Sequence, residues 1–538
     1  VLFCFLVFSI LLVVGGVMVR GGCAGLVTAL MVLFTILATM GISGWIGIQL
    51  SPPSTSVPVI VMTLAVADSV HILANFFHLL RDGVGKVAAM RESLRINLAP
   101  VFLTSLTTAI GFMSLNFSDA PPFRDLGNMA AMGVMIAFLL SMTFLPAMVM
   151  LLPVKAHAAA SRGEKGMARI AEFVIQRQKP LFWGMLVLIV LLVAQLPRNE
   201  LNDVFVEYFD ESIAFRADTD YAAANLTGIY LVEYSLPAAE GGSVTDPAYL
   251  QQVENFANWY RSQPNVMHVN SITDIMKRLN KNLHADEVDW YRLPDNQALS
   301  AQYLLLYEFS LPFGLDLTNQ INVQKTATRM TVTMRTTSTE VLLATERRAQ
   351  AWLAKNTPGY FKAAGTSPTV MFADIGHRNI ISMLQGTTVA LILISAILML
   401  ALRSVRIGII SIIPNLMPIA AAFGLWGMLV GQVGLALSVV SGVTLGIVVD
   451  DTVHFLSKYL RAKREKGLNS ADAIRYAFST VGTALWVTSL VLVLGFGILA
   501  LSNFELNAGM GLLTAITIAL ALLVDFLFLP TLLLKWSK

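Results

Sequence analysis

The stretch Gly446-Ile447-Val448-Val449-Asp450-Asp451-Thr452-Val453-His454 places two carboxyl groups and an imidazole inside a long apolar run. That run, roughly 434–458, is long enough to cross a bilayer as a helix. Residues three or four apart share a helix face, so His454 shares a face with Asp450 and also with Asp451. Ionisable side chains are costly inside a membrane and usually mark a functional site there. This stretch therefore predicts a membrane helix that carries a functional acid cluster.

The composition of the whole chain is typical of a membrane protein. Of its 538 residues, 56% are hydrophobic and 13% are charged, and the mean hydropathy is +0.68. Soluble proteins carry about 25% charged residues, so a soluble globular enzyme, a disordered chain and a nucleic-acid-binding protein are excluded. Apolar runs of about 20 residues span a bilayer as helices. We count eleven such runs, at roughly 1–19, 24–48, 55–80, 97–117, 127–152, 180–197, 380–402, 406–430, 434–458, 479–501 and 508–534.

Basic residues in the loops indicate the orientation, because Lys and Arg favour the cytoplasmic side. When alternate loops are assigned to the two sides, one side holds nearly all of them, and the short loops on the other side hold Arg124 alone. The polar stretch 198–379 falls on the side of Arg124. We therefore expect it to be periplasmic, or extracytoplasmic, in a multi-pass protein of the inner cell membrane. Topology accounts for the basic loops, and binding of anionic lipid is the lesser alternative.

The sequence also contains an internal repeat. The segment Ala67–Leu73 matches Asp450–Leu456 at an offset of 383 residues, and both contain Asp-x-x-His. Because the two copies run in the same direction, they predict halves related by a pseudo-twofold axis along the membrane normal. Two further pairs keep this register to within one residue: Thr104-Ser105-Leu106 with Thr488-Ser489-Leu490, and Phe144-Leu145-Pro146 with Phe528-Leu529-Pro530.

The repeat predicts a polytopic α-helical protein with two halves of six helices, each with a large extracytoplasmic insertion after its first helix. This chain would hold eleven of the twelve helices, and we expect about 200 further residues, with one helix and one soluble domain, to precede Val1. The expected parts are a first-half transmembrane bundle at 1–152, a cytoplasmic linker at 153–179, the seventh helix at 180–197, a soluble domain at 198–379 and a second-half bundle at 380–538.

Residues 198–379 are expected to form an α+β domain. Alternation of apolar residues predicts strands there, and apolar residues at helical spacing predict helices. Their order, two β-α-β units, is typical of the ferredoxin-like fold. A further helix from about Pro368 is expected to run on into the next membrane span. The expected strands are 227–236, 265–272, 329–335 and 360–364, and the expected helices are 247–262, 296–309 and 340–355.

The repeat places carboxyl groups and an imidazole in the middle of one helix from each half. Asp68 and His71 come from the first half, and Asp450, Asp451 and His454 come from the second. We expect the symmetry to bring the two helices together on the axis. Three carboxyl groups and two imidazoles at low dielectric cannot all stay charged, and histidine titrates near neutrality. The expected cluster therefore takes up and releases protons, as a proton relay does.

Other polar residues are candidates to support this relay. Thr104, Thr488 and Ser489 lie on the helix that follows the charged one, and they either hydrogen-bond the carboxyl groups or bond their own backbone. Asp525 in the last span either joins the relay or approaches the cytoplasmic interface. Gly446 is expected to let its helix pack closely against a neighbour.

Three alternatives compete with the proton relay. The first is a static ion network, although an apolar pair would be at least as stable. The second is haem ligation by His71 and His454. The third is an intramembrane aspartyl protease, but the GxGD sequence of such proteases is absent. No metal site is expected, because the two cysteines, Cys4 and Cys23, form no CxxC pair.

These motifs resemble the resistance–nodulation–division (RND) superfamily, and within it the MMPL, hopanoid-transporter and Patched-like branch that contains the sterol-sensing domain. The resemblance rests on Gly446-x-x-x-Asp450-Asp451, on Ala67-Asp68-x-x-His71 and on NDVFVEYFD at 202–210, and it covers the whole chain. It implies a porter domain at 198–379 and proton-relay roles for Asp68, Asp450 and Asp451. The chain departs from the family pattern at Thr63, where a glycine is usual, and at Ala67, where an acid is usual.

The expected function is export of hydrophobic or lipid-like molecules across or out of the inner membrane, driven by the proton-motive force. Such a protein is a secondary active transporter, not an enzyme, and needs no cofactor besides the proton gradient. Its expected partners are the substrate and membrane lipids, and no nucleic acid. A homo-oligomer and a periplasmic partner are left open. The alternatives are a sterol- or lipid-sensing receptor that does not pump and a proton-driven accessory to protein secretion.

Overall fold

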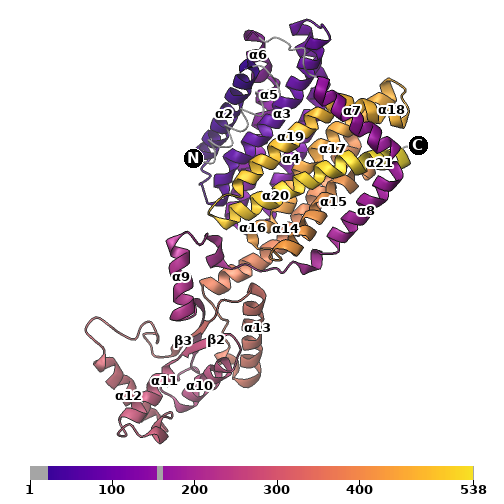
Figure 1. The fold of residues 1–538 in the computed structure, drawn as a ribbon. Helices are drawn as coiled ribbons and strands as arrows, with labels where there is room; N and C mark the ends of the chain where they lie inside the picture. The colour runs from indigo at the N-terminus through magenta and orange to yellow at the C-terminus, as the bar shows by residue number, and fades with distance from the viewer. Residues whose placement is uncertain (1–21, 154–160, 537–538) are drawn as a thin grey trace. The chain divides into compact units, whose positions relative to one another are not determined.

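The computed structural model describes residues 22–153 and 161–536, and the chain divides into two compact units (Figure 1). The helical unit contains residues up to Glu200 and from Arg378 onward, and the soluble unit is Leu201–His377. The expected run 1–19, with Cys4, lies outside the described residues, and so do residues 154–160 near the start of the linker. Each unit is described by itself below.

The helical unit is membrane-spanning. Ten helices among the described residues are long and apolar enough to cross a bilayer, and they coincide with the ten expected runs from 24–48 onward. The spans are built from α2 (Gly22–Trp45), α3 (Val57–Arg81), α4 (Lys86–Met113), α5 (Pro121–Met142) with α6 (Phe144–Leu151), α8 (Gln178–Val193), α14 (Pro368–Ala401), α15 (Val405–Leu429), α16 (Leu435–Ser438) with α17 (Val440–Glu465), α18 (Ser470–Ala477) with α19 (Thr483–Leu499), and α20 (Glu505–Leu523) with α21 (Leu529–Trp536).

Equivalent helices break at equivalent places in the two halves. The last first-half span is interrupted at Thr143, three residues before Pro146. The last second-half span contains a π-turn at Val524–Phe528, just before Pro530. Proline lacks the backbone donor and clashes with the preceding turn, so it distorts the helix at that point. The same local sequence, Phe-Leu-Pro, thus produces an irregular turn in both copies.

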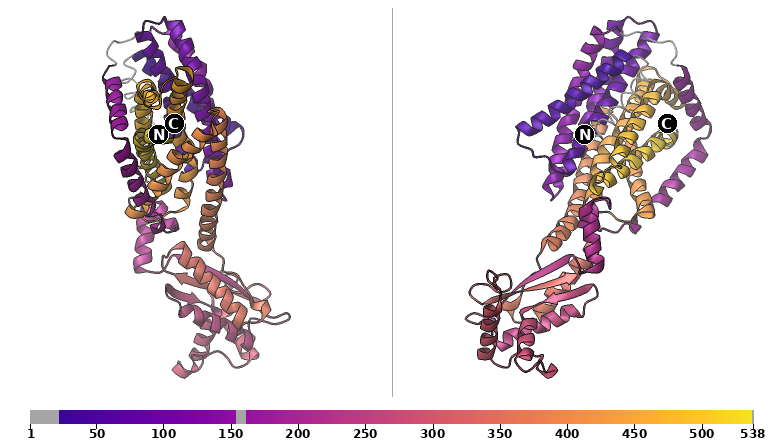
Figure 2. Two further views of the ribbon diagram at one scale, coloured as in Figure 1. Left: turned by 90° about the vertical axis from the view of Figure 1, so that its right-hand side faces the viewer. Right: turned by 60° about the vertical axis from the view of Figure 1, so that its left-hand side comes forward.

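Each half packs its charged helix against a helix of the other half, as a twofold relation requires. Helix α3 lies beside α19, and α17 lies beside α4 (Figures 1 and 2). At the α17–α4 crossing a Cβ on Gly446 would meet Thr108 Cα at 2.9 Å, and Gly111 faces Gly446. At the equivalent α3–α19 crossing Gly495 lies against the methyl group of Thr63. Small residues therefore allow both close crossings.

The linker contains an amphipathic helix, α7 (Ser161–Gln176). Its apolar face buries Met167, Ala171 and Val174. Met167 and Ala171 belong to a core that also contains Phe478 and other second-half residues. On the outer side, Glu172 pairs with Arg475 at 3.0 Å. The linker helix is thus part of the second half of the unit.

The soluble unit is α+β, with a small antiparallel sheet. Its three strands are β1 (Tyr230–Pro237), β2 (Val266–Asn270) and β3 (Ala327–Met334), in the order β1-β3-β2. Thr366 adds a single antiparallel bridge to Glu233 on the free edge of β1. With that bridge as a rudimentary fourth strand, the order 4-1-3-2 is that of the ferredoxin-like fold.

The core of the soluble unit consists of apolar side chains from both its strands and its helices. Met330, Val332 and Met334 of β3 are buried, as alternation predicts. They belong to one cluster with apolar residues from α10 (Pro247–Arg261) and α13 (Thr339–Asn356). Three further helices complete the unit: α9 (Ala214–Asn225), α11 (Ile272–Asn282) and α12 (Gln297–Ser310).

One strand prediction was wrong. Residues 360–364 do not form a strand; a 3₁₀ turn covers Gly359–Phe361 instead. Pro358 favours a turn because it fixes its own backbone and cannot donate to a ladder, and the turn buries Phe361 in the core. Helices α9 and α11 were not predicted. Ser271 caps α11 by accepting a hydrogen bond from the Thr273 amide, and this ends β2 at Asn270.

Candidate functional site

The acid cluster lies inside the helical unit, where α3 and α17 bring both halves together. His71 and His454 are buried, with 2% and 0% of their surfaces exposed. Their rings stack with centroids 3.8 Å apart and planes 6° apart. Residues 383 positions apart are therefore in direct contact, and the contact lies between equivalent residues of the repeat.

One carboxyl group, from the second half, lies beside this imidazole stack. Oδ1 of Asp450 lies 3.5 Å from Nε2 of His454, one helical turn away. The Asp450 carboxyl is close enough to act electrostatically on Asp68, which is only partly buried. Thr104 of α4 lies beside Asp450, although its hydroxyl donates to the carbonyl of Val101 at 3.1 Å.

A second layer of the cluster joins α17 to α19 and to the π-turn before α21. Ser489 Oγ donates to Asp451 Oδ2 at 2.5 Å. Thr452 Oγ1 donates to Asp525 Oδ1 at 2.9 Å, and Asp525 is fully buried, so its carboxyl group lies beside the helix that carries Asp450 and Asp451. Thr488 donates to the carbonyls of its own preceding turn. Of the serine and threonine candidates, Ser489 therefore makes the clear bond to a carboxyl group.

Many polar atoms of the cluster make no hydrogen bond within the described residues. Buried polar groups are usually paired, and each exception needs an explanation. A static ion network would be stable only with its members well paired. Carboxyl oxygens and imidazole nitrogens without a partner are positions at which a proton can bind. The unpaired buried atoms are His71 Nε2, Asp450 Oδ1, Asp451 Oδ1, His454 Nδ1 and Nε2, and Asp525 Oδ2.

Three residues of the cluster are of types that bind metal ions, and they lie close together. His71, Asp450 and His454 each place one ligand atom within 4.8 Å of the others. The two imidazoles, however, are stacked in parallel, and parallel rings do not direct their nitrogens toward one ion. A metal ion would require at least one ring to turn out of the stack.

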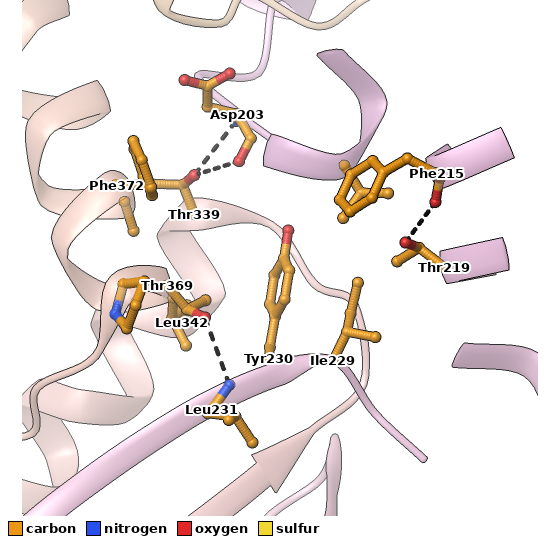
Figure 3. A pocket seen from close by; sticks show the side chains of 13 residues that line it. Asp203, Phe215, Thr219, Ile229, Tyr230, Leu231, Thr339, Leu342, Thr369 and Phe372 are labelled. Atoms are coloured by element: carbon orange, nitrogen blue, oxygen red, sulfur yellow. Dashed lines mark hydrogen bonds between the residues drawn. The ribbon is translucent and has the colours of Figure 1, made fainter. Parts of the chain in front are cut away.

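A separate pocket of about 330 Å³ lies in the soluble unit (Figure 3). Aromatic and aliphatic side chains make most of its wall, among them Phe215, Tyr230, Leu342 and Phe372. Residues of β1 form one side, and the first turns of α14 form another. Pockets of this size and lining are typical of sites for small apolar molecules.

Polar groups hold one edge of this pocket in place. The Thr339 hydroxyl donates to the carbonyl of Asp203 at 3.1 Å, and Tyr208 donates to the Asp203 carboxyl at 2.6 Å. Burial, with Glu207 and Asp203 nearby, raises the pKa of Tyr230 to about 12. Tyr230 is therefore neutral at physiological pH, and its ring adds to the apolar wall.

Comparison with known proteins places the chain in a family. The family model for the MMPL family matches residues 1–184 and 316–538. The chain belongs to the MMPL family. This MMPL chain is 30% identical over 170 residues to a membrane protein of Methanocaldococcus jannaschii, a match that covers 32% of this chain and 43% of that protein.

Solved structures of two RND-superfamily proteins share the fold of this MMPL chain. SecDF, a translocon-associated membrane protein from Thermus thermophilus, has a TM-score of 0.59 and 14% identity, over 99% of this chain and 62% of that chain. The hedgehog release protein Disp from the water bear Hypsibius dujardini has a TM-score of 0.67 and 14% identity, over 100% of this chain and 70% of that one. At this identity the likeness shows the fold alone.

Sequence reasoning missed two features of this MMPL chain. The first is the pocket of the soluble unit, because its lining comes from segments as far apart as Asp203 and Ala373. The second is the burial of Lys458, which is 4% exposed. A lysine at the end of an apolar run is normally assigned to a cytoplasmic loop. The available signal was its spacing, since Lys458 follows His454 by four residues and so shares its helix face.

Proposed function

We propose that this MMPL chain belongs to a proton-driven exporter of hydrophobic or lipid-like molecules. The observation that carries the proposal is the convergence of carboxyl and imidazole groups from both halves inside the helical unit. Asp68 and His71 come from α3, and Asp450, Asp451 and His454 come from α17. In this proposal the protein lies in the inner membrane, with the soluble unit on the periplasmic side.

The chemistry of the cluster supports proton turnover. Several of its buried polar atoms make no hydrogen bond to any residue that the structure describes, so protons can bind there without breaking such a bond. The cluster also lies at the contact between halves, where a change of charge alters how strongly α3 and α17 attract or repel each other. Proton uptake and release would thereby favour different arrangements of the two halves.

The pocket of the soluble unit supports an apolar cargo. Its lining would hold the hydrophobic part of a substrate, and burial contributes about 25 cal/mol for each Å² of apolar surface removed from water. Under this proposal the protein is a transporter, not an enzyme, and the proton gradient takes the place of a cofactor. Its partners would be the substrate and the surrounding lipids.

A second function, a proton-driven accessory to protein secretion, is favoured by the likeness to SecDF, which is described as translocon-associated. Both functions need the relay, but they differ in cargo. Lipid sensing without pumping would need only the pocket of the soluble unit and not the relay.

The test is proton-coupled transport by the reconstituted protein. Asp451→Asn keeps the shape of the side chain and removes its titration, and a neutral amide is tolerated inside a membrane. With a fluorescent phospholipid as probe and an imposed pH gradient, we expect wild-type export and only background export by the variant. Melting temperatures measured on the same samples serve as the folding control. Full export by folded Asp451→Asn protein would refute the relay, and gradient-driven release of a secreted protein without lipid export would favour the secretion function.

A further inference from the structure

A second pocket, of about 380 Å³, lies in the helical unit at the end of α17 that follows the acid cluster. Helix α4, the end of α14 and the last two turns of α17 enclose it. The positive-inside pattern places this end on the cytoplasmic side. The pocket is lined by Arg95, Ile96, Ala99, Pro100, Leu103, Ala401, Leu402, Ser457, Lys458, Leu460, Arg461, Arg464 and Glu465.

Four basic residues and one acid line this pocket, and three of the basic residues already have partners. Arg95 pairs with Glu92 at 2.7 Å, and Arg461 pairs with Glu465 at 2.7 Å. Arg464 donates to the carbonyl of Leu402 at 2.9 Å. Glu465, the one acid of the lining, is therefore already engaged, and the pocket keeps a positive excess.

The fourth basic residue, Lys458, makes no hydrogen bond or ion pair with any residue that the structure describes. It is 4% exposed, and its side chain lines the pocket. A buried charge without a partner is strongly unfavourable. The ammonium group of Lys458 therefore calls for an anion, and the pocket beside it is where that anion fits.

The internal repeat shows that the fold does not require a cation at this position. The equivalent residue of the first half, 383 positions earlier, is Asn75. Its amide donates to Asn97 at 2.9 Å and to the carbonyl of His71 at 3.3 Å. A neutral residue with a hydrogen-bonded amide nitrogen thus occupies the place in one half, while in the other half a lysine without a partner among the described residues faces a pocket.

The rest of the lining is apolar and lies mainly along α4. Ile96, Ala99, Pro100 and Leu103 form a strip on one side, and Leu402 lies opposite. An inorganic anion would leave this strip uncovered, whereas the acyl chain of a lipid would cover it. Basic pockets between membrane helices on the cytoplasmic side are suited to anionic lipid headgroups.

We propose that this pocket binds an anionic phospholipid, with its phosphate at Lys458, Arg461 and Arg464 and an acyl chain along the α4 strip. The binding site contains none of the relay carboxyl groups, so lipid binding can be measured separately from the proposed export. It lies one helical turn beyond His454, so the lipid would fix the end of the helix that carries the relay.

The test measures lipid binding by the purified, delipidated protein in detergent. The probe is phosphatidylglycerol, followed by native mass spectrometry and by the rise in melting temperature, with phosphatidylcholine as the neutral comparison. We expect Lys458→Gln to bind phosphatidylglycerol about fivefold more weakly, as loss of one basic contact implies. Lys466→Gln is the matched control, because Lys466 lies over the Tyr476 ring outside the pocket and should bind as the wild type does.

Two further arms keep the proposal falsifiable. Ala99→Trp fills the apolar strip and leaves every basic residue in place, so it should also weaken phosphatidylglycerol binding, even if Lys458→Gln folds poorly. Inorganic phosphate at the same concentration should not raise the melting temperature. Equal binding of both lipids, unchanged binding by Lys458→Gln and Ala99→Trp, or a Lys458-dependent response to inorganic phosphate alone would each overturn the lipid assignment.

Discussion

The two halves of the helical unit share one register but pair equivalent side chains differently. Ser489 donates to Asp451, whereas its counterpart Ser105 has a buried hydroxyl with no partner among the described residues. Asn75 donates a hydrogen bond to Asn97, whereas its counterpart Lys458 makes no hydrogen bond or ion pair within the described part of the chain. The repeat therefore preserves where helices cross, but not what their polar residues do. The polar chemistry is concentrated on α17 and its neighbours.

The largest expected effect comes from removing a single relay carboxyl group, whether it belongs to the first half or to the second. Asp68→Asn should reduce gradient-driven export to background, as Asp451→Asn does, because both belong to one coupled unit. The double variant should be no worse than either single variant. Export by proteoliposomes, normalised to folded protein, checks this. Substantial export by Asp68→Asn would mean that the second half works alone.

Replacing the equivalent serines Ser489 and Ser105 should have a smaller effect on the export rate, and only at Ser489. Ser489→Ala removes a hydrogen bond to a carboxyl group, and such bonds contribute about 1.5–3 kcal/mol when the partner is charged. We expect its export rate to fall by about tenfold or more, which corresponds to that range. Ser105→Ala is the matched control and should export at the wild-type rate. Equal rates for both variants would show that the Ser489 bond plays no part in the relay.

The two helix crossings should differ in how they tolerate a methyl group. Gly446→Ala places a Cβ against the backbone of Thr108, and overpacking of this kind costs about 1–3 kcal/mol. Gly495→Ala meets only the Thr63 methyl group, so Thr63→Ser should restore its stability. Melting temperatures of the three variants in detergent are the measurement. Tolerance of Gly446→Ala would contradict the close α17–α4 crossing.

The smallest expected effect is on stability, and it distinguishes Asn75 from its counterpart Lys458. Asn75→Leu leaves the buried Asn97 oxygen without its donor and should cost about 1 kcal/mol of stability. Lys458→Met breaks no bond to any described residue, so it should not lower the melting temperature in detergent free of anionic lipid. A clear loss of stability for Lys458→Met under those conditions would indicate a protein partner for the lysine.

Much of the fold was predictable because the bilayer constrains sequence strongly. The ten spans from 24–48 onward followed from hydropathy, and the approach of His71 to His454 followed from the repeat. The unpredicted parts depend on local competition between structures. Residues 360–364 have strand-like composition, but the turn at Pro358 and the burial of Phe361 decide their conformation. Helix α11 is short and polar, so its periodicity gave little signal.

The charged residues of the candidate site could be predicted from the sequence, but the hydrogen-bond partners of these residues could not. Ionisable residues in apolar runs stand out in a sequence, which is why Asp68, Asp450 and Asp451 were found. Which hydroxyl reaches which carboxyl depends on helix rotation, and Ser489 and Thr488 are adjacent in sequence. Lys458 makes no ion pair with a described residue because Glu465, the acid of the same pocket, pairs with Arg461 instead. No local pattern in the sequence indicates which of the two basic residues the acid will pair with.

The stacked imidazoles of His71 and His454 make the contact between halves observable by magnetic resonance. Each ring lies in the shielding cone of the other, so the ring protons of both histidines should resonate upfield of an isolated imidazole. The two residues come from opposite halves, so the shift reports whether the halves are in contact. The shift can be followed in protein with isotope-labelled histidine. Loss of the upfield shift on proton uptake would indicate that α3 separates from α17, and the measurement needs no transported cargo.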